Sequence, residues 1–354
     1  MNSISRYFKK NKKIPLDKFL YEILYNKNFG YYSKKYPFEK KGDFVTSPFI
    51  SSLFGEMLSI WILMFYKNFK KSKKFNIIEL GPGNGGLTKI IQKTLKNFPE
   101  FYNNCNFYLY EKSEYLIKIQ KKNLKQYKIK WIKNFNNLTN GPVLFFGNEF
   151  FDAIPIKQFK RTKKNILECF IKINNEGNIE KIFHKTSVSN KKKINSYKIL
   201  KNSKFIEFPK LGFEFIDSII KKIKKLDGGI LLIDYGYLKQ KNLDTLQSVK
   251  NHKKNELFKN LGNADITSLV NFSLLKNHIT NKNLKVNNIV SQSFFLKKMG
   301  ILERAEIIST KMSFRDKSDL YIRIKRLLDS SLMGELFKVL LAHKSKNKNI
   351  AGFN

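Results

Sequence analysis

Apolar residues along the chain follow two patterns that alternate. Short runs dominated by apolar residues predict buried strands at 75–80, 106–111, 142–147 and 229–237. Between the strands, apolar residues spaced three and four apart predict helices, as over 87–95. Because strands and helices alternate, we expect an α/β fold built on a parallel sheet.

The remaining segments extend this pattern. Two segments, 166–173 and 178–183, read as a β-hairpin inserted between sheet strands. Asp265 reads as the cap of a helix, and Ser47-Pro48 as the cap and first residue of another. Further helices are expected at 14–25, 50–66, 113–124, 212–226, 294–302 and 317–328, and further strands at 129–132, 286–291 and 336–342. We expect four regions: a helical region 1–70, a core half 71–155, a β-rich insertion 156–210 and a second core half 211–354.

A glycine-rich turn, Gly81-Pro82-Gly83-Asn84-Gly85, follows the first strand of the expected sheet. Glycine permits a backbone with positive φ and lets a ligand lie against the main chain. A strand, a glycine turn and a helix in this order are typical of the opening unit of a nucleotide-binding α/β sheet. Gly81, Gly83 and Gly85 are therefore candidate cofactor-binding residues.

Two acidic residues favour one cofactor over another. An NAD site places a pyrophosphate on the helix N-terminus, and Glu79, directly before the turn, would repel it. The same carboxylate suits S-adenosylmethionine (SAM), which carries a sulfonium and an ammonium group and no phosphate. Glu111 ends the second strand, where a carboxylate can hold both ribose hydroxyls. We therefore expect SAM, bound near Glu79, Glu111 and the glycines.

Polar side chains also follow the strand at 142–147. Asn148 and Glu149 come directly after it, and Asp152 follows closely. Because ligands bind outside the carboxyl ends of parallel strands, we expect Asn148 and Glu149 at the same rim as Glu79 and Glu111.

The net charge of +40 on 354 residues would by itself suggest a nucleic-acid or anionic membrane partner. However, 62 of the cations are lysines spread along the chain, and only six are arginines. Lysine, asparagine and isoleucine, all abundant here, have AT-rich codons. Nucleic-acid readers usually need the planar fork of arginine. We therefore attribute the high positive charge to a compositional bias toward AT-rich codons and not to a polyanion partner.

Other features narrow the class of protein. The chain contains no run of about 18 apolar residues that would span a membrane, and its start lacks the apolar core of a secretory signal. Cys105 and Cys169 lack metal-ligand spacing. They suit a reducing compartment and argue against disulfides and a structural metal.

Nine short stretches resemble one family, the MidA-like SAM-dependent methyltransferases. They occur in family order from about Ile14 onward, and together they are highly specific. The stretches are Gly30-Tyr31-Tyr32, 42–48, Phe54-Gly55-Glu56, 79–83, 148–155, 234–237, Asp265-Ile266-Thr267, Gln292 with Phe295-Leu296, and Met333-Gly334. The sequence departs from the family pattern at Phe49, Ser52, Asn84 and Gly86.

This resemblance implies a class I SAM-dependent methyltransferase (Rossmann-like) fold, whose seven-stranded sheet ends in an antiparallel strand. It implies methylation of a protein arginine, and its mitochondrial relatives act on a subunit of respiratory complex I during assembly. The expected location is the cytoplasm of a bacterium or the mitochondrial matrix of a eukaryote. The oligomeric state stays open.

The chemistry of arginine points to carboxylates. A guanidinium has a pKa above about 12, so carboxylates must orient it and draw charge from the attacking nitrogen. Glu149 is the first catalytic candidate, and Asp152 and Asp43 are the next; Asp152 could instead cap a helix. Thr46 and Ser47, in the matching stretch 42–48, join the cofactor-binding candidates.

Two other functions remain open. Asn148-Glu149-Phe150-Phe151 stands where methyltransferases of nucleic-acid bases carry Asn/Asp-Pro-Pro-Tyr/Phe. Glu149 occupies a proline position of that motif, and its carboxylate would repel phosphates while attracting a guanidinium. A SAM-binding assembly factor without catalytic activity would carry the same cofactor motifs.

Overall fold

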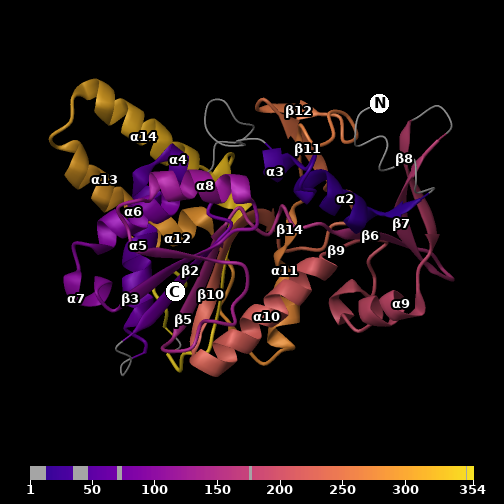
Figure 1. Cartoon of the computed structure of the whole chain (residues 1–354), viewed down its shortest axis with the longest axis horizontal. Coiled ribbons are helices and arrows are strands. Elements are labelled where there is room, and N and C mark those ends of the chain that lie inside the picture. The colour runs from indigo at the N-terminus through magenta and orange to yellow at the C-terminus, as the bar shows by residue number, and fades with distance from the viewer. Residues whose placement is uncertain (1–12, 35–46, 70–73, 175–177, 348) are drawn as a thin grey trace. The chain divides into compact units, whose positions relative to one another are not determined.

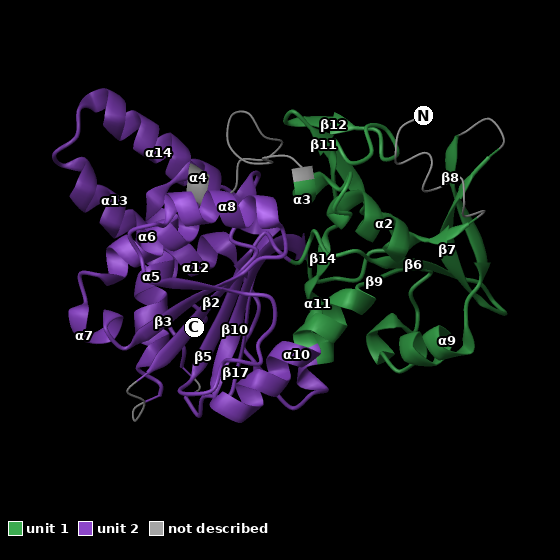
Figure 2. Cartoon of the chain, viewed as in Figure 1, with its two compact units in different colours: residues 1–44, 151–216, 237–278 green, residues 45–150, 217–236, 279–354 purple. Residues whose placement is uncertain are grey.

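The structure is a computed structural model that describes residues 13–34, 47–69, 74–174, 178–347 and 349–354, apart from the side chains of 48 and 49. The chain divides into two compact units (Figure 2). Unit 1 comprises 1–44, 151–216 and 237–278; unit 2 comprises 45–150, 217–236 and 279–354.

Unit 2 is built on a central sheet with the strand order β15-β17-β10-β5-β2-β3-β4. Its strands are β2 (Phe75–Leu80), β3 (Cys105–Tyr110), β4 (Ile129–Ile132), β5 (Val143–Asn148), β10 (Gly228–Tyr237), β15 (Lys285–Val286), β16 (Val290–Ser291) and β17 (Phe337–His343). Strands β2, β3, β4, β5 and β10 pair in parallel, whereas β17 runs antiparallel to β10. The expected α/β fold, with a parallel sheet ending in an antiparallel strand, is therefore confirmed.

Helices lie on both sides of this sheet (Figure 1). They are α4 (Ser47–Ile50), α5 (Ser52–Tyr66), α6 (Gly86–Leu95), α7 (Pro99–Tyr102), α8 (Glu114–Asn123), α10 (Lys210–Leu226), α12 (Gln292–Lys298), α13 (Ile301–Ser309), α14 (Phe314–Leu328) and α15 (Met333–Leu336). Strands β2 and β10 are buried along their whole length, because helices cover both faces.

Unit 1 contains the inserted β-rich segment. Its larger sheet has the order β1-β7-β6-β9, with β8 paired to β7, and a smaller sheet has the order β12-β11-β13. The strands of these two sheets are β1 (Ile14–Pro15), β6 (Lys157–Arg161), β7 (Ile166–Ile173), β8 (Ile179–Lys185), β9 (Phe205–Phe208), β11 (Gln247–Lys250), β12 (Lys253–Asn255) and β13 (Asp265–Thr267). The short strand β14 (Val270–Asn271) belongs to neither sheet. Strands β7 and β8 form the expected antiparallel hairpin.

The helices of unit 1 are α2 (Leu16–Tyr25), α3 (Tyr31–Lys34), α9 (Val188–Asn195), the short η1 (Lys198–Leu200) and α11 (Phe272–Thr280). Helix α2 buries the apolar face that the sequence predicts. A buried ion-pair triad also holds α2: Lys157 Nζ lies 2.9 Å from Asp17 Oδ1 and 2.6 Å from Glu168 Oε1. Losing one partner would leave a buried charge uncompensated, so the triad ties α2 to β6 and β7.

Two capping predictions were wrong. Asp265 does not cap a helix; it begins β13, which pairs with β11, and the next helix starts at Phe272. The long helix after Ser47 is capped by Ser51 instead, whose hydroxyl accepts a hydrogen bond from Leu53 N. Ser47 begins the separate short helix α4.

Candidate active site

The glycine turn after β2 has the backbone that the sequence predicts. Gly81, Gly83 and Gly85 all have positive φ, of 63°, 57° and 85°. A Cβ on Gly81 would lie 2.6 Å from the Phe150 ring, and one on Gly85 would lie 2.7 Å from Leu124. The turn therefore requires glycine both for conformation and for space.

Glu79 lies in β2, directly before this turn, and is buried. Its carboxylate accepts a hydrogen bond from the hydroxyl of Thr88 in α6. Burial raises the pKa of Glu79 to about 7, and the bonds from Thr88 only partly oppose this shift. A carboxyl with this pKa gains its charge readily when a cation binds beside it.

Glu111, after β3, is held by three donors. Its Oε1 accepts from the backbone amides of Lys112 and Ser113, both at 2.8 Å, and its Oε2 accepts from Gln120 Nε2 at 3.3 Å. Burial raises the pKa of Glu111 despite these bonds. The carboxylate is thus fixed in orientation at the end of β3.

Gln120 is a residue of this site that sequence reasoning missed. It is fully buried in α8, donates to Gly83 O at 2.8 Å and accepts from Trp131 Nε1 at 2.8 Å. It therefore connects the glycine turn with Glu111 and β4. The sequence contained one indication of this role for Gln120, which is an uncharged amide on the buried side of a lysine-rich helix.

Asn84 occupies one of the positions where the sequence departs from the family pattern. Its Oδ1 accepts from Gly86 N at 2.8 Å, and its carbonyl accepts from Asn123 Nδ2 at 2.9 Å. Asparagine closes a local turn in this way, so Asn84 stabilises the loop that leads into α6.

Glu149 follows β5 with a left-handed backbone, at φ 51°. This conformation is uncommon for a residue with a side chain and is associated with functional sites. Glu149 N donates to Ile233 O at 2.9 Å, and Oε1 accepts from Asn148 Nδ2 at 3.1 Å. Asn148 Oδ1 is buried and accepts no hydrogen bond from the described residues.

Ser47 contacts Glu149 from the start of α4. Its backbone amide donates to Glu149 Oε1 at 3.2 Å, and its hydroxyl donates to Gln292 Oε1 at 3.4 Å. Gln292 in turn donates to Leu327 O in α14 at 3.0 Å. This chain of bonds links the Glu149 carboxylate to α14.

The register of the parallel strands places these residues along one edge of the sheet. Leu80 pairs with Tyr110, Glu79 with Phe146, and Asn148 with Ile233. Glu79, the glycine turn, Glu111, Asn148 and Glu149 therefore lie at or just beyond the carboxyl ends of β2, β3 and β5, as expected.

The family model described as "Putative S-adenosyl-L-methionine-dependent methyltransferase" matches residues 57–290, which is more than half of the chain. The chain belongs to this methyltransferase family. SAM is accordingly its cofactor, and transfer of a methyl group is its reaction.

Among named relatives, protein arginine methyltransferase NDUFAF7 of Xenopus tropicalis is 28% identical over 96% of this chain and 84% of the relative. Human NDUFAF7 is 28% identical over 94% of this chain and 80% of the relative, and both proteins are named as mitochondrial.

Two crystal structures of proteins from Burkholderia thailandensis share the fold, each covering 99% of this chain and 94% of theirs at 19% identity. Their TM-scores are 0.84 and 0.82, and the second has S-adenosyl-homocysteine bound.

The residues of this methyltransferase fit the cofactor. The turn at Gly81, Gly83 and Gly85 has the positive-φ backbone typical of a cofactor loop, Glu79 offers a buried carboxyl to a cation, and Asn148 Oδ1 is a buried acceptor without a described donor. Glu111 supplies a fixed carboxylate suited to hydroxyl groups.

Asp152, the second catalytic candidate, lies in unit 1. It is buried and caps no helix, because its stretch is a turn without a helix after it. Its carbonyl accepts from Ser268 N at 3.2 Å. Beside it, the Tyr32 hydroxyl donates to Asp265 Oδ2 at 2.9 Å. Burial, followed by the charges of Asp265 and other neighbours including Asp152, raises the pKa of Tyr32.

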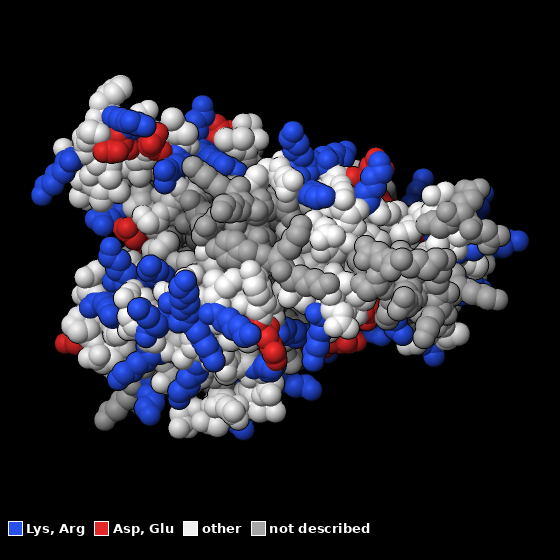
Figure 3. Space-filling view, turned by 45° about the horizontal axis from the view of Figure 1, so that its top comes forward, with Lys and Arg blue, Asp and Glu red and all other residues white. Residues whose placement is uncertain are grey.

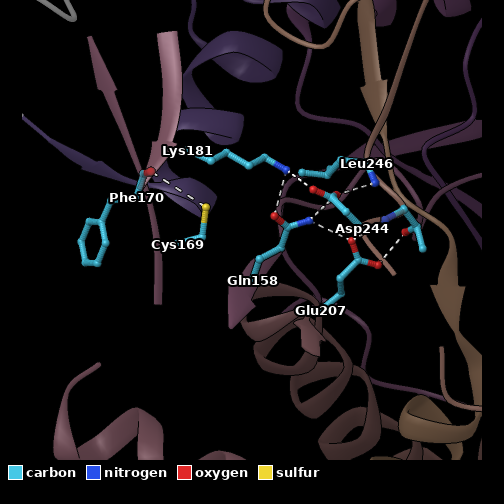
Figure 4. A network of polar contacts seen from close by, with 8 residues as sticks. Gln158, Cys169, Phe170, Lys181, Glu207, Asp244 and Leu246 are labelled. Atoms are coloured by element: carbon cyan, nitrogen blue, oxygen red, sulfur yellow. Dashed lines mark hydrogen bonds and ion pairs between the residues drawn. The ribbon is translucent and has the colours of Figure 1, made fainter. Parts of the chain in front are cut away.

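A second polar network in unit 1 extends from buried Gln158 and Glu207 to exposed Asp244. Figure 4 shows Gln158 and Lys181 pointing toward Asp244 and Glu207. Gln158 Nε2 donates to Glu207 Oε1 at 2.9 Å and to Asp244 Oδ1 at 2.6 Å, and Lys181 also pairs with Asp244. These bonds join β6, β8 and β9 to the loop at 244, and we assign them a structural role.

Two candidates, Asp43 and Thr46, lie outside the described residues, as does the side chain of Phe49.

Within the described part of the chain, no group of acidic, histidine and cysteine side chains is placed to hold a metal ion. None of the helices searched there is long and apolar enough to cross a membrane.

Proposed function

We propose that this methyltransferase acts on an arginine side chain of a protein and that Glu149 receives the guanidinium. The observation that carries the proposal is the fixed Glu149 carboxylate at the end of β5, on a left-handed backbone. The names of the relatives from Xenopus tropicalis and humans support arginine as the acceptor.

SAM supplies an electrophilic methyl group on a sulfonium. The part of the protein is alignment, because an in-line displacement depends on the position of the attacking atom. Ser47 N and Asn148 Nδ2 both donate to Glu149 Oε1, so two donors fix the carboxylate before the substrate arrives. An ionised carboxylate accepts the forked donors of a guanidinium and attracts its charge.

Other residues have assigned parts in this proposal. Eight residues form the proposed cofactor-binding set: Glu79, Gly81, Gly83, Gly85, Glu111, Asn148, Thr46 and Ser47. Asp152 and Asp43 are the next carboxylates to test if Glu149 is not the one that meets the substrate. The family resemblance implies a complex I subunit as the acceptor. The corresponding place of action is the bacterial cytoplasm or the mitochondrial matrix.

The test is the chemical identity of the methylated product. The purified methyltransferase is incubated with methyl-labelled SAM and an extract of cells that lack the methyltransferase. The label is located after protein hydrolysis. We expect the label in methylarginine. Label in RNA or DNA bases would support the base-methylating alternative, and no label in any macromolecule would support a binding role without catalysis.

A further inference from the structure

Arginine is distributed unevenly in this lysine-rich chain. Only six residues are arginine, against 62 lysines, and four of the six lie between positions 304 and 326. These four are in α13 and α14: Arg304, Arg315, Arg323 and Arg326. Drift toward lysine codons does not explain such a cluster, and arginine differs from lysine in its planar fork of donors.

Three of these arginines are exposed on α14. Arg304 pairs with Glu56, with Nε 2.9 Å from Oε2. Arg315, Arg323 and Arg326 are exposed, and no described residue forms an ion pair with them. Their donors are therefore available to a partner.

Helix α14 buries one stripe and exposes the opposite one. Ile324 and Leu327 are buried at 2% and 0% exposure. On the opposite stripe, Arg315 and Arg326 lie at helical spacing on either side of Ile322, which is 63% exposed. Phe314, at the start of the same helix, is 90% exposed.

Exposed apolar residues continue beyond this stripe. Ile307 in α13 is 64% exposed, and Leu302, Met312 and Tyr321 are exposed as well. Helices α13 and α14 are neighbours, and exposed apolar residues gathered on adjacent elements are a feature of interaction sites. Arginine, methionine and aromatic residues are also the types enriched in protein–protein interfaces.

The charges of this surface are mixed, as on many protein-binding surfaces. Glu303, Glu306, Asp316 and Asp319 are exposed among the arginines. At the upper left of Figure 3, where α13 and α14 lie, red and blue atoms occur together. Residues 302–326 carry seven lysines and arginines against these four acids, so their net charge is positive, and arginine forks between apolar side chains suit carboxylates on a protein.

The end of α14 is hydrogen-bonded toward the candidate active site. Gln292 donates to Leu327 O in its last turn and accepts from Ser47, whose amide binds Glu149. Hydrogen bonds therefore connect α14, on its buried side, with the carboxylate that the substrate arginine is proposed to reach.

We propose that the outer face of α13 and α14, residues 302–326, is the docking surface for the protein substrate, which presents carboxylates and apolar side chains to it. This proposal rests on the proposed function. It assigns the recognition of the substrate protein to a surface outside the candidate active site.

The test compares two acceptors. One is the protein that wild type labels with methyl-labelled SAM, and the other is a short peptide that spans its labelled arginine. The variant combines Arg315→Ala, Arg323→Ala and Arg326→Ala. We expect KM for the protein to rise about tenfold or more, with kcat unchanged, because interface anchors are lost. Kinetics with the peptide should stay unchanged.

A matched control removes the same charge elsewhere on unit 2. Lys221, Lys224 and Lys225 are exposed on α10, and their combined change to Ala should leave KM for the protein unchanged. An arginine-to-lysine triple variant should raise KM by an intermediate factor, because lysine keeps the charge but loses the fork.

Several outcomes would overturn the docking surface. One is an unchanged KM for the protein in the alanine variant. Another is an equal loss of activity with the protein and with the peptide. A third is an alanine variant that no longer binds a single-stranded RNA probe but still methylates the protein as wild type does. A lysine variant equal to wild type would refute the need for guanidinium. If wild type labels no protein at all, the proposed function fails first, and the docking surface fails with it.

Discussion

The backbone amide of Ser47 donates to the carboxylate of Glu149 across 102 positions of sequence, at 3.2 Å. The amide starts α4, and the carboxylate follows the central strand β5. Glu149 therefore caps the start of α4 as well as facing the edge of the sheet. Any change that moves α4 should move the carboxylate with it.

Gln292 is predicted to be a positioning residue through this contact. It is fully buried and joins Ser47 to α14. Gln292→Ala should lower kcat by about tenfold, because misplaced reacting groups lose the benefit of alignment. SAM affinity should change by much less. A fall in melting temperature with unchanged kcat in the folded enzyme would show that Gln292 is only structural.

Gly83→Val should abolish SAM binding. A branched side chain at φ 57° is strained and blocks the approach of a ligand to the main chain. Gly300→Val is the matched control, because Gly300 also has a positive φ, of 82°, but precedes α13 and is not part of the glycine turn. Calorimetry should show lost SAM binding only in the first variant. Equal SAM affinity in both folded variants would refute the cofactor assignment.

SAM affinity should depend on pH through Glu79, whose pKa is raised by burial to about 7. The raised pKa means that the unliganded protein keeps a proton there that the unfolded chain has lost. The contribution of Glu79 to stability is therefore present at acid pH and lost as pH rises toward about 7. A cationic ligand favours the ionised form, so affinity should rise about tenfold between about pH 6 and pH 8.

Glu79→Gln tests this dependence. The amide cannot titrate, so its SAM affinity should be flat over the same range. A wild-type affinity that is flat too would contradict the contact between Glu79 and a cationic group.

Much of the sheet and of its functional edge could be predicted from the sequence. Strands β2 and β4 have the expected bounds, because short apolar runs that end in a turn have few alternatives. Glu79, Glu111, Asn148 and Glu149 stand at strand ends, so their placement followed from the parallel sheet alone.

Contacts between distant segments could not be predicted. Ser47 and Gln292 are 245 positions apart, and no local pattern indicates that they meet. Asp265 was misread because an acid before apolar residues suits both a helix cap and a strand; pairing with β11 decides for the strand. The alternative that Asp152 caps a helix is wrong, since a capping residue needs a helix after it, and Asp152 lies in a turn.

The central claim is that the charge of Glu149 receives the substrate guanidinium. The most direct test is the methyl-transfer rate of Glu149→Gln to the arginine acceptor, measured with SAM affinity and melting temperature on the same preparation. Glutamine keeps the shape and removes the charge, so turnover should fall by about 10² or more. SAM affinity should stay within a few-fold of wild type, and melting temperature should stay unchanged. Full turnover in this variant would contradict the claim and direct attention to Asp43 or Asp152.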